Sequence, residues 1–286
     1  MKSRDEGTKG RRDGGEGARR SIRNPRSSIP NCQSSIPNPQ PPGVMDASYA
    51  LGRKTKPHLL FRLRSRAEVV VRAVRRYRAG GSLRLLEIGA AEGRTLVEMA
   101  SAIGVGEYIG IEYDDGLRQA HAPLPPNVKL IRGDAMSLPS ECGQASFDVV
   151  SMLAVLEHLS DSSAAMAEAF RILKPGGLLV ATCPNPFWDA VAHRLRLVDE
   201  SVHVQDISLA GLRELATSNG FETLAARGFM WAPLAALPYL GIPVSPKFAL
   251  DLDGLVDRLP WLRKLCVNAY LVARRPEHRE QSADGD

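Results

Sequence analysis

The sequence has few cysteines, and no two of them form a CxxC pair. Cys32, Cys142, Cys183 and Cys266 lie far apart along the 286 residues. Such spacing offers neither a disulfide framework nor a zinc site, so we expect reduced thiols in a cytoplasmic protein. The N-terminus also lacks the apolar stretch that a signal peptide needs.

Long apolar runs without prolines are missing as well. The longest uncharged run is 228–246, and prolines at 233, 238, 243 and 246 interrupt it. Prolines at this density make a poor membrane-spanning helix. We therefore expect no transmembrane segment.

Excess charge is absent outside the N-terminal tail. Residues 1–44 hold nine Lys/Arg and four Asp/Glu, which accounts for the whole net charge of +5, while residues 45–286 hold equal numbers of both signs. A neutral folded part gives no reason to expect a nucleic-acid partner, and an RNA-directed role guided by the basic tail is disfavoured. Residues 1–44 are rich in Gly, Ser, Arg and Pro and are predicted to be a disordered tail, or a translated stretch ahead of a working start at Met45.

A basic amphipathic helix is predicted within residues 55–79. Apolar residues recur at helical spacing from Leu59 to Tyr77, and seven arginines lie between Arg62 and Arg78. Such a face is usually solvated, but it also fits an anionic membrane surface. Gly80 and Gly81 end the predicted helix.

Strands and helices then alternate regularly. Strands are predicted at about 83–88, 107–112, 127–132, 146–152 and 178–183, with helices between them, and two more at 221–226 and 268–273. Strands rich in Val, Ile and Leu that alternate with helices predict an α/β fold. We expect a doubly wound, Rossmann-like, mostly parallel seven-stranded sheet with helices on both faces.

The predicted domain spans 45–275 and is followed by a disordered tail at 276–286. Ser208 is expected to cap a helix that continues to Ser218. Residues 229–266 form an apolar insertion or cap between the last two strands, with an amphipathic helical piece at 249–266.

The turn after the first strand indicates the ligand. Glu87-Ile88-Gly89-Ala90-Ala91-Glu92-Gly93-Arg94 joins a strand to a helix through small residues, which let a ligand approach the backbone. A dinucleotide site needs G-x-G-x-x-G, but here Ala91 and Arg94 replace two glycines. Glu87 and Glu92 would repel a pyrophosphate and suit a cationic ligand.

The turn and four later motifs together resemble the class I S-adenosylmethionine-dependent methyltransferases, above all the branch of the ubiquinone and menaquinone methyltransferases. Ile111 to Asp114, Gly133 to Met136, Phe147 to Leu159 and Leu173 to Gly177 follow the family order, and the core spans 83–226. The resemblance implies S-adenosylmethionine as cofactor, with Glu112 on the ribose and Asp134 on the adenine. The expected cofactor-binding residues are Glu87, Gly89, Ala91, Gly93, Glu112, Tyr113, Asp134, Ala135 and Ser151.

Two histidines are candidate catalytic residues. His158 follows the fourth strand at the rim of the crevice and could act as a base, or belong to the family's helix start. His203 precedes the Ser208 helix and either lines the acceptor site or is an ordinary loop residue. Some relatives bind a divalent metal through Glu-x-x-Glu-His. Ala154 stands at the first position here, so no metal is predicted.

The predicted function is methyl transfer to a small-molecule or lipid-like acceptor, at oxygen or carbon. The apolar segment 229–246 is expected to pack on the sheet edge or to contact an apolar acceptor, and with the Arg62–Arg78 helix it suggests peripheral contact with the inner face of a membrane. No obligate protein partner is implied. The alternatives are an NAD(P)-dependent oxidoreductase and a non-catalytic binding protein of the same fold.

Overall fold

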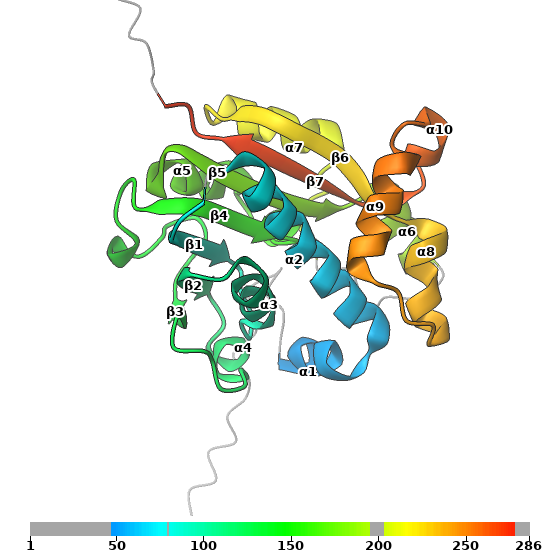
Figure 1. Ribbon diagram of the computed structural model, residues 1–286, viewed down its shortest axis with the longest axis horizontal. Helices are drawn as coiled ribbons and strands as arrows, with labels where there is room; N and C mark the ends of the chain where they lie inside the picture. The colour runs from blue at the N-terminus through cyan, green and yellow to red at the C-terminus, as the bar shows by residue number, and fades with distance from the viewer. Residues whose placement is uncertain (1–46, 79, 195–202, 278–286) are drawn as a thin grey trace, which may run out of the picture. The chain divides into compact units, whose positions relative to one another are not determined.

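A seven-stranded sheet runs through the part of the chain that the computed structural model describes, residues 47–78, 80–194 and 203–277 (Figure 1). The strands are β1 (Leu83–Ile88), β2 (Gly106–Glu112), β3 (Val128–Arg132), β4 (Phe147–Leu153), β5 (Leu173–Pro184), β6 (Glu222–Trp231) and β7 (Cys266–Arg274). Their order is β3-β2-β1-β4-β5-β7-β6, and β7 runs antiparallel to both of its neighbours. The expected mostly parallel seven-stranded sheet is confirmed. The predicted tail 1–44 and most of 276–286 lie outside the described residues.

Helices cover both faces of the sheet, as the alternation predicted. One face packs against α2 (Pro57–Tyr77), α3 (Arg94–Ile103) and α9 (Pro246–Val256), and the other against α5 (Ser162–Ile172) and α7 (Leu209–Ser218). The remaining helices are α1 (Ala47–Thr55), α4 (Asp115–Gln119), α6 (Pro186–Arg194), α8 (Ala232–Ala236), α10 (Pro260–Arg263) and the 3-10 turns η1 (Ser140–Cys142), η2 (Leu156–His158) and η3 (Leu237–Leu240). None of the helices in the described ranges is long and apolar enough to span a membrane.

Burial on both faces explains the apolar strand sequences. Leu83, Leu85, Leu86 and Ile88 of β1 are at most 2% exposed, although they point alternately to the two sides of the sheet. Glu87 is the exception within this strand, because it is a carboxyl group that is only 2% exposed. A buried acid in an apolar strand is costly unless a ligand or a proton compensates it.

The last third of the chain departs from the predicted boundaries. Strand β6 continues to Trp231 because it pairs with β7 as far as Cys266, so the predicted insertion starts inside a strand. The predicted helical piece at 249–266 divides into α9 and α10 and ends where β7 begins. We call the helical residues between β6 and β7, 232–265, the cap. Helices α1, α6 and α8 had not been predicted as helices.

Helix α2 is confirmed, but its arginines are not a free basic face. Arg64 pairs with Glu98 at 2.9 Å, and Arg72 pairs with Glu68 at 3.0 Å and with Asp251 at 2.8 Å. Arg75 donates to the Ala102 carbonyl oxygen. The helix lies across the sheet (Figure 1), so these side chains contact neighbouring elements although they remain partly exposed at the surface.

Chain order places a crevice at the carboxyl ends of β1 and β4. Strand β1 pairs with β2 on one side and with β4 on the other, so the connections leave these two strands in opposite directions. Open α/β sheets bind their ligands at such a switch point.

Candidate functional site

Two cavities occupy this end of the sheet and share residues. The first, which we call the turn cavity, has a volume of about 360 Å³ and lies against the turn after β1 and the ends of β2, β3 and β4. The second, the cap cavity, has a volume of about 450 Å³ and extends under α8 and η3. Both are lined by Arg53, Arg66, Gly89, Leu153, Ala154 and His158. Two ligands, one in each cavity, could therefore contact each other directly.

Most of the predicted cofactor residues line the turn cavity. These are Gly89, Ala91, Glu112, Tyr113, Asp134 and Ala135. Glu87 lines the cap cavity instead, whereas Gly93 and Ser151 line neither. Ser151 lies inside β4 and is fully buried, with a hydroxyl oxygen that has no hydrogen-bond partner among the described residues.

Backbone amides of the turn are already used within the protein. The N–H groups of Gly89 and Ala90 both donate to the Ile111 carbonyl oxygen at 2.9 Å, and the N–H of Ala91 donates to Glu112 Oε2 at 2.8 Å. A pyrophosphate needs such amides to point at the ligand. Their internal use adds a second reason, besides Ala91 and Arg94, against a dinucleotide on this turn.

Glycine is required at the start of the turn. Gly89 has φ of +72°, and a Cβ placed there would lie 2.2 Å from Val155 Cγ2. Gly93 has φ of +74° and forms the N-cap of α3, where a Cβ would crowd Leu130 at 3.1 Å. Gly89 therefore shapes the cavity wall, and Gly93 acts indirectly by starting the helix.

Two acids mark the ends of β2 and β3. Glu112 accepts hydrogen bonds from the N–H groups of Ala91 and Asp114, at 2.8 and 2.9 Å. Burial raises the pKa of Glu112, and these backbone hydrogen bonds oppose the rise. Asp134 Oδ1 accepts from the Met136 N–H at 2.8 Å, which fixes its carboxylate at the cavity wall. Each carboxylate keeps further lone pairs for a ligand hydroxyl or amine.

Glu87 and Glu92, predicted as a pair, have different surroundings. Burial raises the pKa of Glu87 to about 8, Arg53 opposes the rise, and Glu92 and Glu112 add to it. Glu87 Oε2 has no hydrogen-bond partner among the described residues. Glu92 forms an ion pair with Arg53 at 2.5 Å and lines neither cavity, so its charge is balanced within the protein. Arg53 lies on α1, which the sequence pattern did not reveal.

His158 and His203 come together although they are far apart in sequence. Their ring centroids are 5.0 Å apart, and His158 lines both cavities while His203 lines the cap cavity. His203 Nδ1 lies 2.7 Å from Asp189 Oδ2, and this hydrogen bond raises the pKa of His203. Asp189 was not predicted, because nothing in the sequence connects α6 with the segment before α7.

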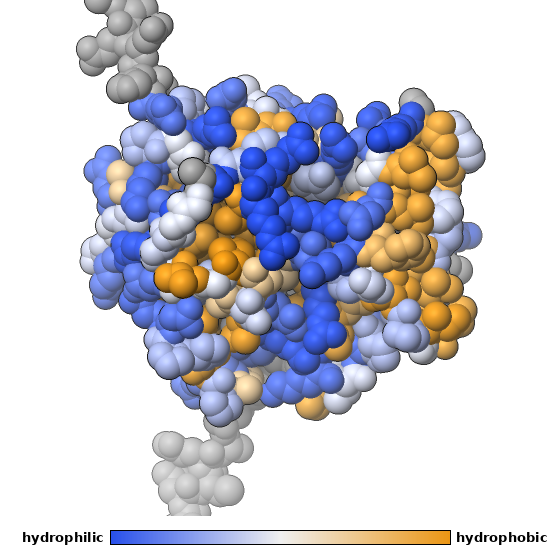
Figure 2. Space-filling model, viewed as in Figure 1, coloured by the Kyte–Doolittle hydropathy of each residue, from blue (hydrophilic) through white to orange (hydrophobic). Residues whose placement is uncertain are grey.

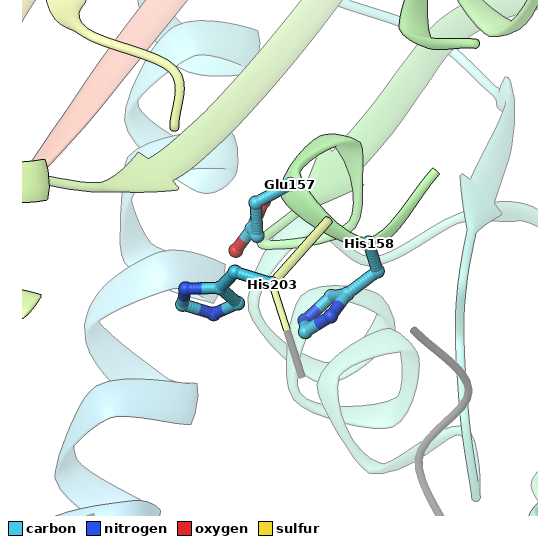
Figure 3. A group of neighbouring side chains, drawn as sticks. All are labelled: Glu157, His158 and His203. Atoms are coloured by element: carbon cyan, nitrogen blue, oxygen red, sulfur yellow. The ribbon is translucent and has the colours of Figure 1, made fainter. Parts of the chain in front are cut away.

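Glu157 completes a group with the two histidines (Figure 3). It is 2% exposed, and burial raises its pKa to about 7. One ligand atom from each of Glu157, His158 and His203 lies within 4.8 Å of the others, so their separation allows a shared ion. The adjacency of Glu157 to His158 was visible in the sequence, but the approach of His203 was not.

A mixed wall encloses the cap cavity. Its apolar part comes from Leu153, Trp188, Val191, Ala235, Tyr239 and Leu240. Arg62 and Arg66 of α2 line the same cavity, and Arg66 Nη2 donates to Asn268 Oδ1 at 3.3 Å. Tyr239 of the cap stacks on His58 of α2 with ring centroids 4.1 Å apart, which ties the cap to the helix.

A family model described as a methyltransferase domain matches residues 53–226. A Mycolicibacterium smegmatis protein named as an S-adenosylmethionine-dependent methyltransferase is 32% identical over 173 residues, which are 60% of this chain and 64% of that protein. A demethylmenaquinone methyltransferase of Staphylococcus aureus is 33% identical over 102 residues, 34% of this chain and 42% of that enzyme. The chain thus covers less than two thirds of each relative.

Solved structures share the fold at low sequence identity. An S-adenosylmethionine-dependent methyltransferase from Archaeoglobus fulgidus aligns with a TM-score of 0.53 at 17% identity, over 80% of this chain and all of that one. The cyclase SpnF aligns with a TM-score of 0.53 at 22% identity, over 74% of this chain and 81% of that one. The same architecture therefore carries proteins named for different reactions.

Proposed function

The chain belongs to the class I S-adenosylmethionine-dependent methyltransferases, and from this premise we propose that it transfers a methyl group to an apolar small-molecule or lipid-like acceptor at oxygen or carbon. The observation that best supports this proposal is that two cavities meet at Gly89, Ala154 and His158. One cavity has the acids and small residues expected for the cofactor. The other has apolar walls and candidate catalytic side chains.

The residues of the turn cavity fit this cofactor. Asp134 and Ala135 would border the adenine, and Glu112 would accept from both ribose hydroxyls because its carboxylate has lone pairs beyond its two backbone bonds. Glu87, buried and with one unpartnered oxygen, would accept from the amino group of the methionine part. When bound, S-adenosylmethionine supplies a methyl group bonded to a positively charged sulfur. The sulfur is a good leaving group because it departs as the neutral thioether of S-adenosylhomocysteine.

The protein's contribution to the reaction is orientation. In-line displacement needs the acceptor atom on the far side of the methyl group from sulfur. The two cavities adjoin at Leu153, Ala154 and His158, so ligands in them could reach each other there. An acceptor with a large apolar part would bury it against Trp188, Tyr239 and Leu240. Demethylmenaquinone, named for a relative, is an acceptor of this class.

We propose that His158 and His203 act on the acceptor. His158 lines both cavities and His203 lies beside it in the cap cavity. A hydroxyl acceptor must lose its proton around the time of attack. Asp189 supports His203 through the hydrogen bond to Nδ1. Carbon acceptors adjacent to a hydroxyl need the same proton loss.

Calorimetry tests the cofactor assignment. S-adenosylhomocysteine should bind at least 100-fold more tightly than NAD, since the turn amides are not available to a pyrophosphate. Tighter binding of NAD would favour the oxidoreductase alternative. Labelled S-adenosylmethionine should then mark a product in an apolar extract, and failure to label any extract despite tight S-adenosylhomocysteine binding would favour the non-catalytic alternative.

Peripheral membrane contact is part of the proposal, with the cap as the contact surface. Figure 2 shows apolar side chains gathered over α8 and α9, beside a hydrophilic stripe along α2. Leu240 is 75% exposed and Trp261 is 66% exposed, and Phe248 and Leu255 are each 57% exposed. Several arginines of α2 are engaged within the protein, so the cap supplies most of the surface for this contact.

Vesicle flotation tests this contact. The protein should float with phosphatidylglycerol vesicles, and Leu240→Ser with Trp261→Ser should reduce the bound fraction several-fold. Val105→Ser is the matched control, because Val105 is 78% exposed but lies between α3 and β2, outside the cap. Wild-type protein that stays with the unbound fraction would contradict the membrane contact and leave the cofactor assignment untouched.

A further inference from the structure

Helix α2 contributes two arginines to the wall of the cap cavity. Arg62 and Arg66 are one helical turn apart, so they lie on the same side of α2, and both line this cavity. Arg66 Nη2 donates to Asn268 Oδ1 at 3.3 Å, which holds its guanidinium at the wall. Arg62 lines the cavity without an ion pair or a hydrogen bond to any residue in the described ranges.

Neighbouring arginines of α2 show how such a charge is otherwise compensated. Arg64 pairs with Glu98 at 2.9 Å, and Arg72 pairs with Glu68 at 3.0 Å. Arg64 is exposed, whereas Arg62 is half-buried and therefore has less access to water. A guanidinium that has lost part of its hydration is costly unless an anion or other hydrogen-bond acceptors replace the water.

Two groups close to Arg62 respond to its positive charge. Burial lowers the pKa of His58, which lies one turn earlier on α2, and the charges of Arg62 and Lys56 lower it further. The hydrogen bond with His203 is the main cause of the lowered pKa of Asp189, and the charge of Arg62 adds to it. Both shifts indicate a positive potential at this wall of the cavity.

The acids that line the cap cavity do not balance this potential. Asp189 is hydrogen-bonded to His203 at 2.7 Å, so its charge is used to stabilise the imidazolium that forms when His203 accepts a proton. Burial raises the pKa of Glu157 to about 7 and that of Glu87 to about 8, so both carboxyl groups hold much of their proton at neutral pH. An excess of positive charge on α2 therefore remains in the cavity. Figure 3 shows Glu157 and His203 beside this helix.

We propose that the acceptor is a hydroxy acid with an apolar body, and that Arg62 and Arg66 bind its carboxylate. A carboxylate offers two oxygens side by side, and these match the planar donors of a guanidinium. Two arginines on one side of a helix can hold both oxygens. This acceptor class rests on the proposed function, which assigns the cap cavity to the acceptor, and it narrows the substrates to those that carry a negative charge.

Binding the carboxylate at α2 also orients the acceptor. Arg62 lines the cap cavity alone, whereas His158 lines both cavities. An acceptor held by its carboxylate at Arg62 can place its hydroxyl at His158, beside the cofactor, while its apolar body packs against Trp188 and Tyr239. A molecule without the carboxylate would displace water from Arg62 and offer nothing in return, so the cavity selects against it.

Pairs of acids and esters test the acceptor class. Calorimetry with the full chain compares ω-hydroxydodecanoate and p-coumarate, each with its own methyl ester, in the presence and absence of S-adenosylhomocysteine. At least one acid should bind at least 10-fold more tightly than its ester, because only the acid forms charge-assisted hydrogen bonds. Arg62→Gln should weaken binding of that acid about 10-fold and leave the ester within twofold, and Arg62→Lys should retain part of the preference.

Arg64→Gln is the matched control on the same helix. Arg64 pairs with Glu98 and lines neither cavity, so this variant should keep the full preference for the acid. If neither acid binds more tightly than its ester, or if Arg62→Gln keeps the preference, the carboxylate site is overturned.

S-adenosylhomocysteine affinity, measured on the same samples, separates this site from the proposed function. Arg62 does not line the turn cavity, so Arg62→Gln should keep that affinity, which also shows that the variant is folded. A preference for the acid that depends on Arg62, in a protein that binds no S-adenosylhomocysteine, would support the carboxylate site and contradict the proposed function. Tight S-adenosylhomocysteine binding without any preference for an acid would overturn the carboxylate site and leave the proposed function in place.

Discussion

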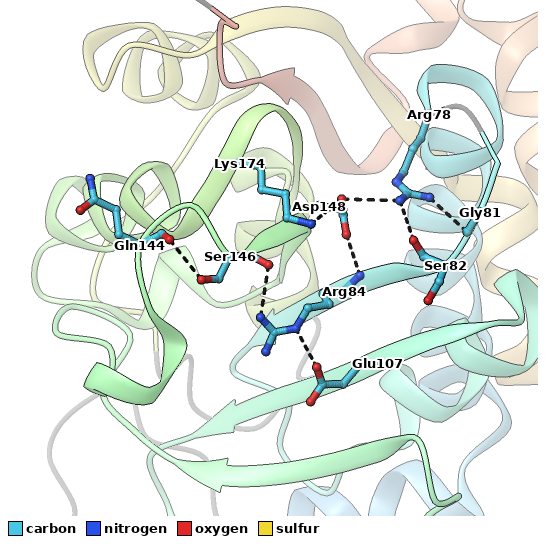
Figure 4. Close-up of polar contacts among 9 residues, drawn as sticks. All are labelled: Arg78, Gly81, Ser82, Arg84, Glu107, Gln144, Ser146, Asp148 and Lys174. Atoms are coloured by element: carbon cyan, nitrogen blue, oxygen red, sulfur yellow. Dashed lines mark hydrogen bonds and ion pairs between the residues drawn. The ribbon is translucent and has the colours of Figure 1, made fainter.

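The two ends of one sheet handle their buried charges in opposite ways. At the amino ends of the strands, Asp148 accepts from the Arg84 N–H at 2.8 Å and pairs with Lys174 at 3.1 Å and with Arg78 at 3.5 Å (Figure 4). Glu107 pairs with Arg84 at 2.6 Å. Burial would raise the pKa of Asp148, but the Arg84 N–H and the cations lower it. Every charge in this network has a partner of opposite sign.

Carboxyl groups at the other end are left with spare acceptors. Glu87 and Glu157 are buried, each has an oxygen with no hydrogen-bond partner among the described residues, and burial raises the pKa of each. Glu112 is held by backbone N–H groups alone. Glu92 also has an oxygen, Oε1, with no hydrogen-bond partner among the described residues, but it differs from Glu87 and Glu157 because its other oxygen forms an ion pair with Arg53.

This difference separates a structural edge from a binding edge. Charges that serve stability are compensated within the protein, since an uncompensated buried charge is destabilising. Groups that serve a ligand are left incomplete until the ligand arrives, and their perturbed pKa values record that cost. The following experiments test whether the two ends differ in this way.

The largest expected effect concerns Glu87 and pH. Its carboxyl group keeps its proton up to about pH 8 in the folded protein but loses it near pH 4.5 when unfolded, so the free energy of unfolding falls as pH rises between these values. Glu87→Gln removes this dependence. The variant should match wild type near pH 5 and exceed its stability at pH 8, by about 4 kcal/mol at most.

Urea unfolding at pH 5, 6.5 and 8 measures this difference. Asp148→Asn is the control from the other end, because the pKa of Asp148 is lowered and its contribution is already complete above pH 5. That variant should be less stable than wild type by the same amount at all three pH values. Parallel curves for Glu87→Gln and wild type would show that Glu87 is ionised in the folded protein.

Gly89→Ala should destabilise the protein by about 2–3 kcal/mol and abolish measurable S-adenosylhomocysteine binding. The new Cβ would lie 2.2 Å from Val155 Cγ2, at a φ of +72° that alanine adopts poorly. Gly241→Ala is the matched control, because Gly241 has a similar φ of +76° with no atom within 4 Å of its Cβ. It should cost about 1 kcal/mol and leave binding intact. Equal costs for the two variants would argue against a packing role for Gly89.

The next test replaces one acid from each end of the sheet by its neutral amide and compares the effects on binding and on stability. Glu112→Gln should weaken S-adenosylhomocysteine binding about 10- to 30-fold, because charge-assisted hydrogen bonds to the ribose are lost, with little change in stability. Asp148→Asn should lower stability by about 1–2 kcal/mol and leave binding within twofold. Calorimetry and urea unfolding on both variants measure the two effects. Weaker cofactor binding by Asp148→Asn would contradict the assignment of stability to one end of the sheet and of binding to the other.

Ser151→Ala should have the smallest effect. Ser151 was predicted to contact the cofactor, but it is buried in β4 and lines neither cavity, and its hydroxyl has no partner among the described residues. Removing an unsatisfied buried hydroxyl should change stability by less than about 0.5 kcal/mol, and S-adenosylhomocysteine affinity by less than twofold. A tenfold loss of affinity would instead support the prediction that Ser151 contacts the cofactor.

Much of the fold followed from local pattern. Strand β1 was predicted with its observed bounds, and the Ser208 cap of α7 is confirmed by the hydrogen bond to the Gly211 N–H. Both are local: the strand is a short apolar run, and the cap is a contact three residues along the chain. The end of β6 was not predicted, because its pairing with β7 depends on residues far along the chain.

The candidate site was likewise predictable only where its features are local in sequence. The strands, the glycine turn and the acids that end β1, β2 and β3 could be predicted from the sequence, because each lies within one short stretch of consecutive residues. Contacts between distant segments, by contrast, are visible in the structure alone: Arg53 pairs with Glu92, Ser151 lines neither cavity, and Asp189 holds His203 beside His158. These contacts join segments that are distant in sequence and depend on how α1, α6 and η2 pack. A short stretch of sequence carries no information on which distant segment it will contact.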